Sequence, residues 1–360
     1  MKRLNNDLSS IYGDVNAWDF FENQLNSLSP TKIFVLTDVN TNKHCLPYFF
    51  EKTGLKKQVQ VLTIAAGEVY KNISTCVVLW NELSQNGADR DSLLINLGGG
   101  VVTDLGGFVA CTFKRGIPFI NIPTSLLAMV DASVGGKNGV DLGSLKNQVG
   151  VIKNPLQVLI DIAFLETLPR PQLVSGHAEM LKHGLIYSKA YWDKVQYFDL
   201  DRKIEASDLI WESVLIKNEV VTEDPREKGR RKTLNYGHTL GHAIESYFME
   251  VSQKNTSTKA LLHGEAIAIG MILATYLSYR LCSFPKKKLE TITSTIISFF
   301  GKVSFERHDI EEIITLLAYD KKNRGGTVYF VLLTDIGQYK INCTVENKLI
   351  FEAFDYYEKS

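Results

Sequence analysis

The first half of the chain alternates short, almost continuously apolar runs with segments of helical periodicity. Four such runs, at 33–36, 59–64, 93–97 and 119–122, are rich in Val, Ile, Leu and Phe. A helical pattern over 72–86 separates the second run from the third. A strand that is apolar on both faces needs cover on both faces, which a parallel sheet obtains from its crossover helices. The pattern therefore predicts an α/β, Rossmann-like domain.

The second half of the chain has mainly helical periodicity. Pro169 and Pro171 interrupt the chain where the pattern changes, so we expect two domains, 1–170 and 171–360. One late hairpin is expected, with strands at 327–333 and 338–343. Helical segments are predicted at 173–187, 206–221, 237–249, 264–281, 287–300 and 309–319.

Charge and cysteine content narrow the classes of function. Lys+Arg and Asp+Glu number 40 each, which disfavours nucleic acid or an anionic membrane as a partner and favours a small ligand held by a local basic site. The five cysteines are scattered without a Cys-x-x-Cys pair, which predicts neither a disulfide framework nor a thiolate metal cluster. We find no secretory leader and no apolar run of bilayer length, which predicts a cytoplasmic protein.

A glycine-rich turn, Leu97–Asp104, follows the third apolar run and opens a helix. Its three glycines let the backbone approach a pyrophosphate, and free N–H groups at the helix start attract anions. The turn departs from G-x-G-x-x-G, so on its own it fits a plain tight turn equally well. Asp38 and Asn40 follow the first run, and Glu68 and Lys71 follow the second. Each alone fits a helix cap or a solvated loop; together they predict one bound nucleotide.

Histidines gather in three segments of the second half. His238 and His242 stand four residues apart on one helix, and His263 immediately precedes an apolar helix. The third segment carries Glu179 and, three residues on, Lys182. A catalytic zinc takes three N/O ligands and keeps one position open. Spacing alone does not choose among His177, His183, His238, His242 and His263.

The order of these motifs resembles the 3-dehydroquinate synthase family over nearly the whole chain. The most specific stretch is Pro123–Lys137. Two departures are Asn138, where a threonine is common, and a short insertion at about 251–259, and neither removes a charged group. The other motifs that carry the likeness are Gly98–Gly100, Asp104, Gly107–Ala110, Arg115-Gly116, Lys146-Asn147, Gly176–Lys182, Lys217, Asp224–Arg231, Leu234–Glu245 and His263–Glu265.

The resemblance implies an NAD- and zinc-dependent lyase of the shikimate pathway, with cobalt as an alternative metal. It would convert 3-deoxy-D-arabino-heptulosonate 7-phosphate to 3-dehydroquinate and phosphate by transient oxidation, phosphate elimination, re-reduction and aldol closure. It implies metal ligation by Glu179, His238 and His263, and leaves His177 and His183 with structural roles. A homodimer is also implied, in which Arg115 would reach the neighbouring subunit's site.

The resemblance also implies which residues contact the cofactor and the doubly anionic substrate, whose carboxylate and phosphate need cations at two places. His242 is expected to manage protons near the leaving phosphate. The implied cofactor contacts are Asp38, Asn40, Glu68, Lys71, Gly98, Gly99, Gly100, Asp104, Thr124, Ser125, Asp131, Lys137, Lys146, Phe164, Thr167 and Leu168. The implied substrate contacts are Arg115, Asp131, Lys137, Lys146, Asn147, Lys182, Lys217, Arg231, Asn235, His242 and Lys321 or Lys322. The implied catalytic set is Lys137, Lys217, Glu227, Arg231, Asn235 and His242.

Three other functions remain as alternatives. A metal-dependent polyol dehydrogenase would share the glycine-rich turn and the histidines, but it would produce NADH and need no paired anion sites. A sister sugar phosphate cyclase that makes an inosose or a valiolone would differ at the substrate end. A non-catalytic relative would be expected to lose a metal ligand or a proton-handling residue, whereas Glu179, His238, His242 and His263 are all present.

Overall fold

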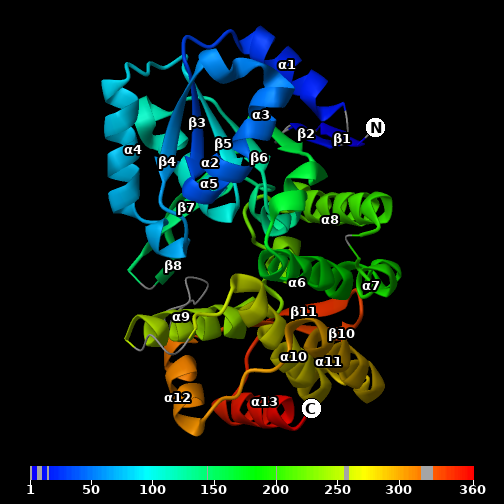
Figure 1. Cartoon of the computed structure of the whole chain (residues 1–360). Coiled ribbons are helices and arrows are strands. Elements are labelled where there is room, and N and C mark those ends of the chain that lie inside the picture. Colours follow the sequence, from blue (N-terminus) through cyan, green and yellow to red (C-terminus); the bar gives the residue numbers. More distant parts are fainter. Residues whose placement is uncertain are drawn as a thin grey trace. The chain divides into compact units, whose positions relative to one another are not determined.

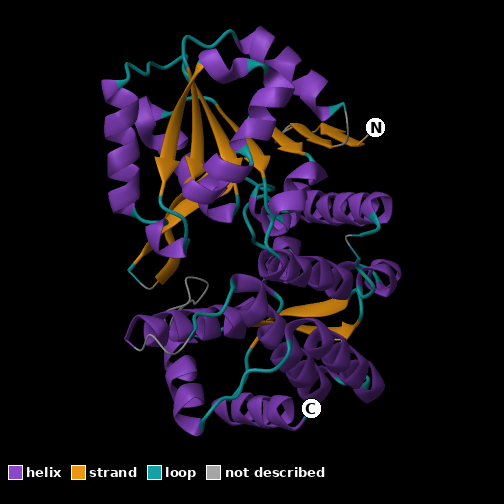
Figure 2. Ribbon diagram, viewed as in Figure 1, coloured by secondary structure: helices purple, strands orange, loops and turns teal. Residues whose placement is uncertain are grey.

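The computed structural model describes residues 2–5, 10–13, 16–143, 145–199, 201–254, 259–317 and 327–360. The chain separates into two compact units, Met1–Leu173 and Val174–Ser360. The first unit holds a seven-stranded sheet with helices, and the second is mainly helical (Figures 1 and 2). The fold class predicted from the sequence is thus confirmed. The unit boundary falls at residue 173, three residues beyond the expected domain boundary.

The sheet of the first unit contains all four apolar runs expected to form strands. Six strands pair in parallel, and only β1 is antiparallel, at one edge. Every residue of β5 and β6 is buried, which explains why these runs lack polar alternation. The strands in sheet order are β1 (Lys2–Asn5), β2 (Ser10–Gly13), β9 (Gln157–Ile160), β6 (Phe119–Pro123), β5 (Leu93–Gly98), β3 (Ile33–Asp38) and β4 (Val59–Ile64).

Two clusters of apolar side chains hold the first unit together. One cluster packs α4 and α5 against the sheet, with Phe34, Leu79 and Phe108 among its buried members. In the other, Trp18 of α1 lies close to the ring of Phe49 of α3. A hairpin, β7 (Lys137–Leu142) and β8 (Leu145–Ile152), packs against α5. The helices of this unit are α1 (Ala17–Leu28), α2 (Val39–His44), α3 (Leu46–Thr53), α4 (Ile73–Gln85) and α5 (Gly100–Thr112).

The second unit is built around α10, which packs against α9, α11, α13 and β10. The late hairpin is present, but its first strand spans Phe330–Asp335 rather than 327–333, because Phe330 is the first residue that pairs with β11. The elements are α6 (Arg170–Tyr187), α7 (Lys189–Val195), α8 (Lys203–Glu223), η6 (Arg230–Asn235), α9 (His238–Lys254), α10 (His263–Cys282), α11 (Lys286–Phe300), α12 (Arg307–Leu316), β10 (Phe330–Asp335), β11 (Gln338–Cys343) and α13 (Asn347–Lys359).

Helix α10 is long and apolar enough to cross a membrane by length and composition. The sequence analysis found no run of that length, and on this criterion the expectation was wrong. Most of the helix is buried within the second unit, including Ala266 to Ala274. A buried core helix satisfies the same test of length and hydropathy, so the finding is weak evidence for a membrane span.

Candidate functional site

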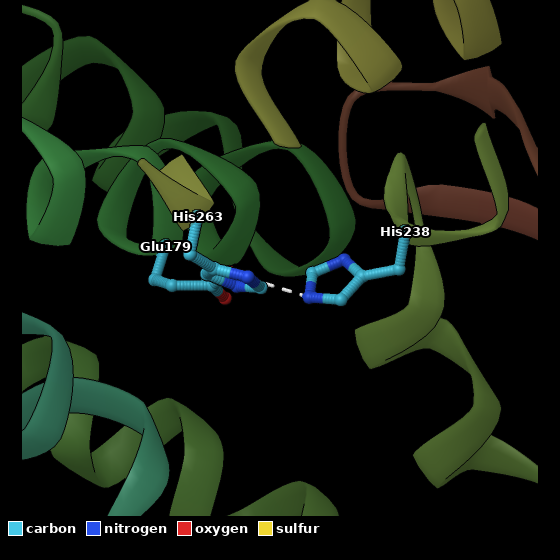
Figure 3. A group of neighbouring side chains, drawn as sticks. All are labelled: Glu179, His238 and His263. Carbon is cyan, nitrogen blue, oxygen red and sulfur yellow. Dashed lines mark ion pairs between the residues drawn. The ribbon is translucent and has the colours of Figure 1, made fainter. Parts of the chain in front are cut away.

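Three side chains of the second unit converge on one point. Glu179 comes from the middle of α6, and His238 and His263 are the first residues of α9 and α10. The Nε2 atoms of His238 and His263 lie 3.3 and 3.5 Å from Glu179 Oε1 (Figure 3). The three prospective ligand atoms all lie within 4.8 Å of one another. One carboxylate oxygen and two imidazole nitrogens at this spacing form a donor set typical of zinc.

Two glycines permit the close packing that brings these ligands together. A Cβ on Gly264 would lie 2.0 Å from the backbone oxygen of Ser175, so the start of α10 can touch α6 only without a side chain there. Gly237 has a φ of 76° and precedes His238, and its Cβ would lie 2.6 Å from Met271 Cγ. The positions of both histidines therefore depend on a neighbouring glycine.

The second nitrogen of each histidine has its own acceptor. His238 Nδ1 lies 3.1 Å from the carbonyl oxygen of Tyr236, and His263 Nδ1 lies 3.1 Å from Glu245 Oε2. Because these acceptors accept a hydrogen bond from Nδ1, Nε2 is the nitrogen of each ring that faces Glu179 and would bind a metal. Carboxylate or carbonyl partners of this kind orient metal-ligating histidines in general. The site therefore fits a zinc or cobalt ion.

Burial and neighbouring charges set the protonation of this group. Burial lowers the pKa of His238 to about 4, with Lys182 adding to the effect. Burial acts in the same direction on His263, but the carboxylates of Glu245 and Glu179 outweigh it and raise the pKa of His263 to about 10. Burial of Glu179 is outweighed by Lys182, which holds the pKa of Glu179 well below its usual value. The carboxylates of Glu179 and Glu245 thus favour a positive charge at His263, which either a proton or a divalent metal can supply.

His242 and Glu245 lie on the same helix as His238. The His242 ring centroid is 5.1 Å from that of His238 and 5.9 Å from that of His263. His242, Glu245 and His263 form a second possible ligand group, but His263 belongs to both. The sequence analysis gave Glu245 no role. Its signal was the spacing of seven residues from His238, which is two turns along one helix face.

The other two candidate histidines make separate hydrogen bonds. His177 Nε2 lies 2.8 Å from the carbonyl oxygen of Val195, and its ring stacks on Phe198. Burial lowers the pKa of His177 to about 4. His183 Nδ1 lies 2.6 Å from Ser213 Oγ. Each of these two histidines thus has a hydrogen-bonding partner within the second unit.

The predicted substrate-binding residues that are described in the second unit lie on α6, α8, η6 and α9. Lys182 is buried and its ammonium group pairs with Glu179 Oε2. Arg231 is 2% exposed and donates from Nη1 to the carbonyl oxygen of Pro225, 2.9 Å away. Asn235 Nδ2 donates to Glu227 Oε1 at 2.6 Å. Of the remaining predicted residues, Lys217 is buried on α8, and Lys321 and Lys322 lie outside the described residues.

In the first unit, charged residues from separate segments meet in one cluster. Lys71 Nζ lies 2.7 Å from Glu68 Oε1, 3.7 Å from Asp104 Oδ2 and 3.8 Å from Asp141 Oδ1. Lys146 Nζ lies 3.0 Å from the same Glu68 oxygen and 3.5 Å from Asp141 Oδ2. Four of these five residues were predicted to contact the cofactor or the substrate. Asp141 was not.

The glycine-rich turn lies where the sequence places it. β5 ends at Gly98, and Gly99 is the N-cap of α5, which begins at Gly100. A Cβ on Gly99 would lie 3.2 Å from Ser125 Oγ, so the turn runs close to the segment after β6. No side chain caps the start of α5, and N–H groups at the start of a helix are in general suited to binding anions.

Asp38 stands at the end of β3 and caps α2. Its Oδ1 accepts hydrogen bonds from the backbone N–H groups of Asn40 and Thr41, at 2.8 Å each. This is the helix-cap alternative that the sequence analysis left open for these residues.

The other predicted contacts of the first unit are spread over several elements. Phe164 is buried beside Tyr48, with ring centroids 5.2 Å apart. Arg115 has a φ of 73° and is exposed. Lys137 is the exposed first residue of β7, Asn147 lies in β8, Thr124 and Ser125 directly follow β6, Asp131 lies in the π-helical turn η4 (Ala128–Ala132), and Thr167 and Leu168 close the turn η5 (Ile162–Thr167).

Comparison with known proteins gives consistent results along the chain. The family models described as 3-dehydroquinate synthase N-terminal and C-terminal match residues 61–175 and 176–323. A 3-dehydroquinate synthase from Parabacteroides distasonis is 43% identical over 339 residues, covering 93% of this chain and 94% of the relative. A crystal structure of 2-deoxy-scyllo-inosose synthase with carbaglucose-6-phosphate, NAD+ and Co2+ has a TM-score of 0.81 at 26% identity, covering 96% of each chain.

A 2-epi-5-epi-valiolone synthase from Streptomyces hygroscopicus, with a TM-score of 0.84 at 22% identity over 99% of this chain and 98% of that one, shares the fold. The family models together cover more than half of this chain, and the bacterial relative matches it at 43% identity over nearly its full length. The chain therefore belongs to the 3-dehydroquinate synthase family.

Proposed function

We propose that this protein converts 3-deoxy-D-arabino-heptulosonate 7-phosphate to 3-dehydroquinate and phosphate, as an enzyme of the shikimate pathway. The observation that carries the proposal is the Glu179, His238 and His263 group in a chain 43% identical to a 3-dehydroquinate synthase. The inosose synthase is only 26% identical, so the dehydroquinate reaction is favoured over that of a sister cyclase.

When bound, NAD and a zinc or cobalt ion would supply, respectively, a reversible hydride acceptor and a Lewis acid for the reacting hydroxyl. Glu179, His238 and His263 would hold the metal. Tyr236 and Glu245 would fix the two imidazole rings through Nδ1. The protein's own contribution at this centre is to orient three ligands before the substrate arrives.

The charged residues would divide the binding of cofactor and substrate. In the first unit, the start of α5 and the Glu68–Lys71–Lys146 cluster offer N–H groups and two ammonium groups to anionic oxygens. In the second unit, Lys182 and Arg231 are buried cations suited to a phosphate or carboxylate. The other contacts predicted in the sequence analysis, among them Asp38 and Lys217, are likewise proposed to bind the cofactor or the substrate.

His242 would hold a proton close to the leaving phosphate, one helical turn after His238. His242→Ala is expected to lower kcat by about 10²–10⁴-fold, the usual contribution of general acid–base catalysis. Metal content should stay at the wild-type level, since His242 is outside the proposed ligand set. Steady-state kinetics and metal analysis check this, and wild-type kcat in the variant would remove His242 from the mechanism.

The reaction itself is tested by following phosphate and 3-dehydroquinate together, with metal-loaded protein, the heptulosonate phosphate and catalytic NAD⁺. We expect equal release of both products, loss of activity with a chelator, and no lasting NADH absorbance. NADH that accumulates without phosphate would identify a polyol dehydrogenase. Inertness toward this substrate, with turnover of a hexose or heptulose phosphate, would identify a sister cyclase.

We propose further that the protein is a cytoplasmic homodimer that binds neither nucleic acid nor membranes. Its balanced charge of 40 basic and 40 acidic residues supports the second part. Sedimentation of the purified protein tests the dimer, and a monomer over a wide concentration range would contradict it.

A further inference from the structure

Asp141 is a buried carboxylate to which neither the metal site nor the predicted cofactor contacts assign a role. Its side chain is 7% exposed and lies near the end of β7. Oδ1 accepts a hydrogen bond from the backbone N–H of Asn147 at 2.6 Å and lies 3.8 Å from Lys71 Nζ. Oδ2 lies 3.5 Å from Lys146 Nζ. One side chain thus contacts three residues proposed to bind cofactor or substrate.

The backbone of Asp141 is attached to the same neighbours. Its N–H donates to the carbonyl oxygen of Lys71 at 2.8 Å, and it forms an isolated bridge with Asn72. Lys71 Nζ in turn donates to Asn147 Oδ1 at 3.0 Å. Asp141, Asn147 and Lys71 therefore close a ring of three hydrogen bonds that joins the β7–β8 hairpin to the loop before α4.

The conformation of Asn147 depends on this ring. Asn147 has a φ of 52°, which a non-glycine residue adopts at some cost in free energy. The Asp141 carboxylate satisfies the N–H of that strained residue, and the ladder of the hairpin is irregular between Val140 and Leu142. Asp141 is thus placed to offset the strain at Asn147 and to fix the position of Lys146, which precedes it.

The charges of the cluster point to the same role. Glu68 bridges the two lysines through one oxygen and is one-third exposed, whereas Asp141 contacts both lysines and is almost fully buried. Burial raises the pKa of Asp141, and the two lysines oppose that effect. An anionic ligand can displace Glu68, the more exposed carboxylate, from the two lysines, while the buried Asp141 keeps its contacts with both.

We propose that Asp141 is a positioning residue that presets Lys71, Lys146 and Asn147 for the anionic oxygens of the cofactor and the substrate. The inference rests on the proposed function, because it takes these residues to be ligand contacts. It predicts that loss of the carboxylate weakens binding far more than it slows the chemical steps.

Two variants separate the two contributions of the carboxylate. Asp141→Asn keeps the shape and an oxygen for the Asn147 N–H but removes the charge, whereas Asp141→Ala removes both. We expect the Kd for NAD⁺, measured by titration calorimetry on metal-loaded protein, to rise about tenfold in the first variant and about a hundredfold in the second. KM for the heptulosonate phosphate should rise in parallel, with kcat at saturation within about threefold of wild type.

Asp89→Asn is the matched control in the same unit. Asp89 is a turn carboxylate that accepts hydrogen bonds from Thr31 and Ser92, and no site residue contacts it among the described residues. We expect it to lower thermal stability and leave the Kd for NAD⁺ unchanged.

The outcomes distinguish the inference from the proposed function. If wild-type protein binds NAD⁺ and forms dehydroquinate but Asp141→Asn keeps Kd and KM within twofold, the inference is wrong, even where stability falls. If Asp141→Ala fails to fold, Asp141→Asn alone decides. Wild-type protein that neither binds NAD⁺ nor releases phosphate would overturn the proposed function itself.

Discussion

Glu179→Gln is expected to abolish tight binding of the divalent metal and to reduce turnover by about a thousandfold or more. Glutamine has nearly the same shape as glutamate, but it carries no charge to neutralise the metal. Glu179 Oε1 lies 3.3 and 3.5 Å from the two histidine nitrogens, so it is the anionic member of the proposed ligand set. A Lewis acid contributes several kcal/mol to such a step, and each 1.4 kcal/mol is about tenfold in rate.

The same change should lower stability in the absence of metal. Glu179 is fully buried and pairs with Lys182, which is 1% exposed. Removing one partner of a buried ion pair typically costs about 3–5 kcal/mol. Three quantities therefore have to be measured together. They are the metal content after dialysis against a weak chelator, kcat in metal-supplemented buffer, and the melting temperature.

His177→Gln provides a control for the loss of stability. His177 lies two residues before Glu179 on α6, is 2% exposed and bonds to the carbonyl oxygen of Val195. We expect this variant to be destabilised while it retains one metal per chain and most of its activity. A Glu179→Gln protein that still carries one tightly bound metal would show that another group, such as His242 with Glu245, holds the ion.

Four of the seven strands of the sheet could be predicted because their signal is local, whereas β1, β2 and β9 were not predicted. β3, β5 and β6 are almost entirely buried, and a run that is buried on both faces is apolar nearly throughout; the edge strand β4 alternates more, yet it still begins and ends with apolar residues. The β7–β8 hairpin was not predicted as strands. Its segment is rich in glycine and polar residues, and its packing against α5 depends on contacts far apart in the sequence.

The candidate metal centre, too, depends on contacts between segments that are far apart in the sequence. Spacing marked five histidines and left the choice among them open, whereas the likeness to a family selected His238 and His263 with Glu179. The spacing of residues in the sequence does not predict that α10 packs closely against α6, a contact that requires the absence of a side chain at Gly264. The roles of the individual site residues stay predictions until variants are measured.

Asp141 illustrates why some site residues escape sequence reasoning altogether. In the sequence it is one of 40 acidic residues and precedes an ordinary glycine-containing turn. Its importance arises from three partners that come from two segments of the chain, Lys71 in one and Lys146 and Asn147 in the other, and Lys71 and Asn147 are 76 residues apart. No pattern in the local sequence predicts that these residues are in contact.

Lys71→Met is expected to lower the free energy of unfolding by about 3–5 kcal/mol at neutral pH, the usual result of removing one partner of a buried ion pair. Lys71 is 5% exposed and faces Glu68, Asp104 and Asp141. Methionine fills a similar volume but leaves these carboxylates with less positive charge nearby. An exposed lysine of the same unit, Lys32, serves as control, since Lys32→Met should change stability by less than about 0.5 kcal/mol.

The pH dependence of this loss identifies its electrostatic origin. Burial lowers the pKa of Lys71, but the facing carboxylates outweigh it and raise the pKa above its ordinary value. Likewise burial of Glu68 is outweighed by Lys71 and Lys146, which hold its pKa below the ordinary value. A lowered carboxyl pKa stabilises the fold above the unfolded value of about 4.3, and that contribution is lost as pH falls through the folded pKa. A raised lysine pKa stabilises below about 10.4 and its contribution is lost at higher pH.

The stability difference between wild type and Lys71→Met should therefore be largest between about pH 5 and pH 10 and shrink on acidification below about pH 4. Urea unfolding at pH 7, 5 and 2.5 measures it, and taking the difference between the two proteins removes the titration of groups whose pKa the substitution leaves unchanged. A difference that does not shrink between pH 5 and pH 2.5 would mean that Lys71 acts by packing alone. The cluster would then not hold its charged groups in place for a ligand, because the ionisation of Glu68, Asp104 and Asp141 would not depend on Lys71.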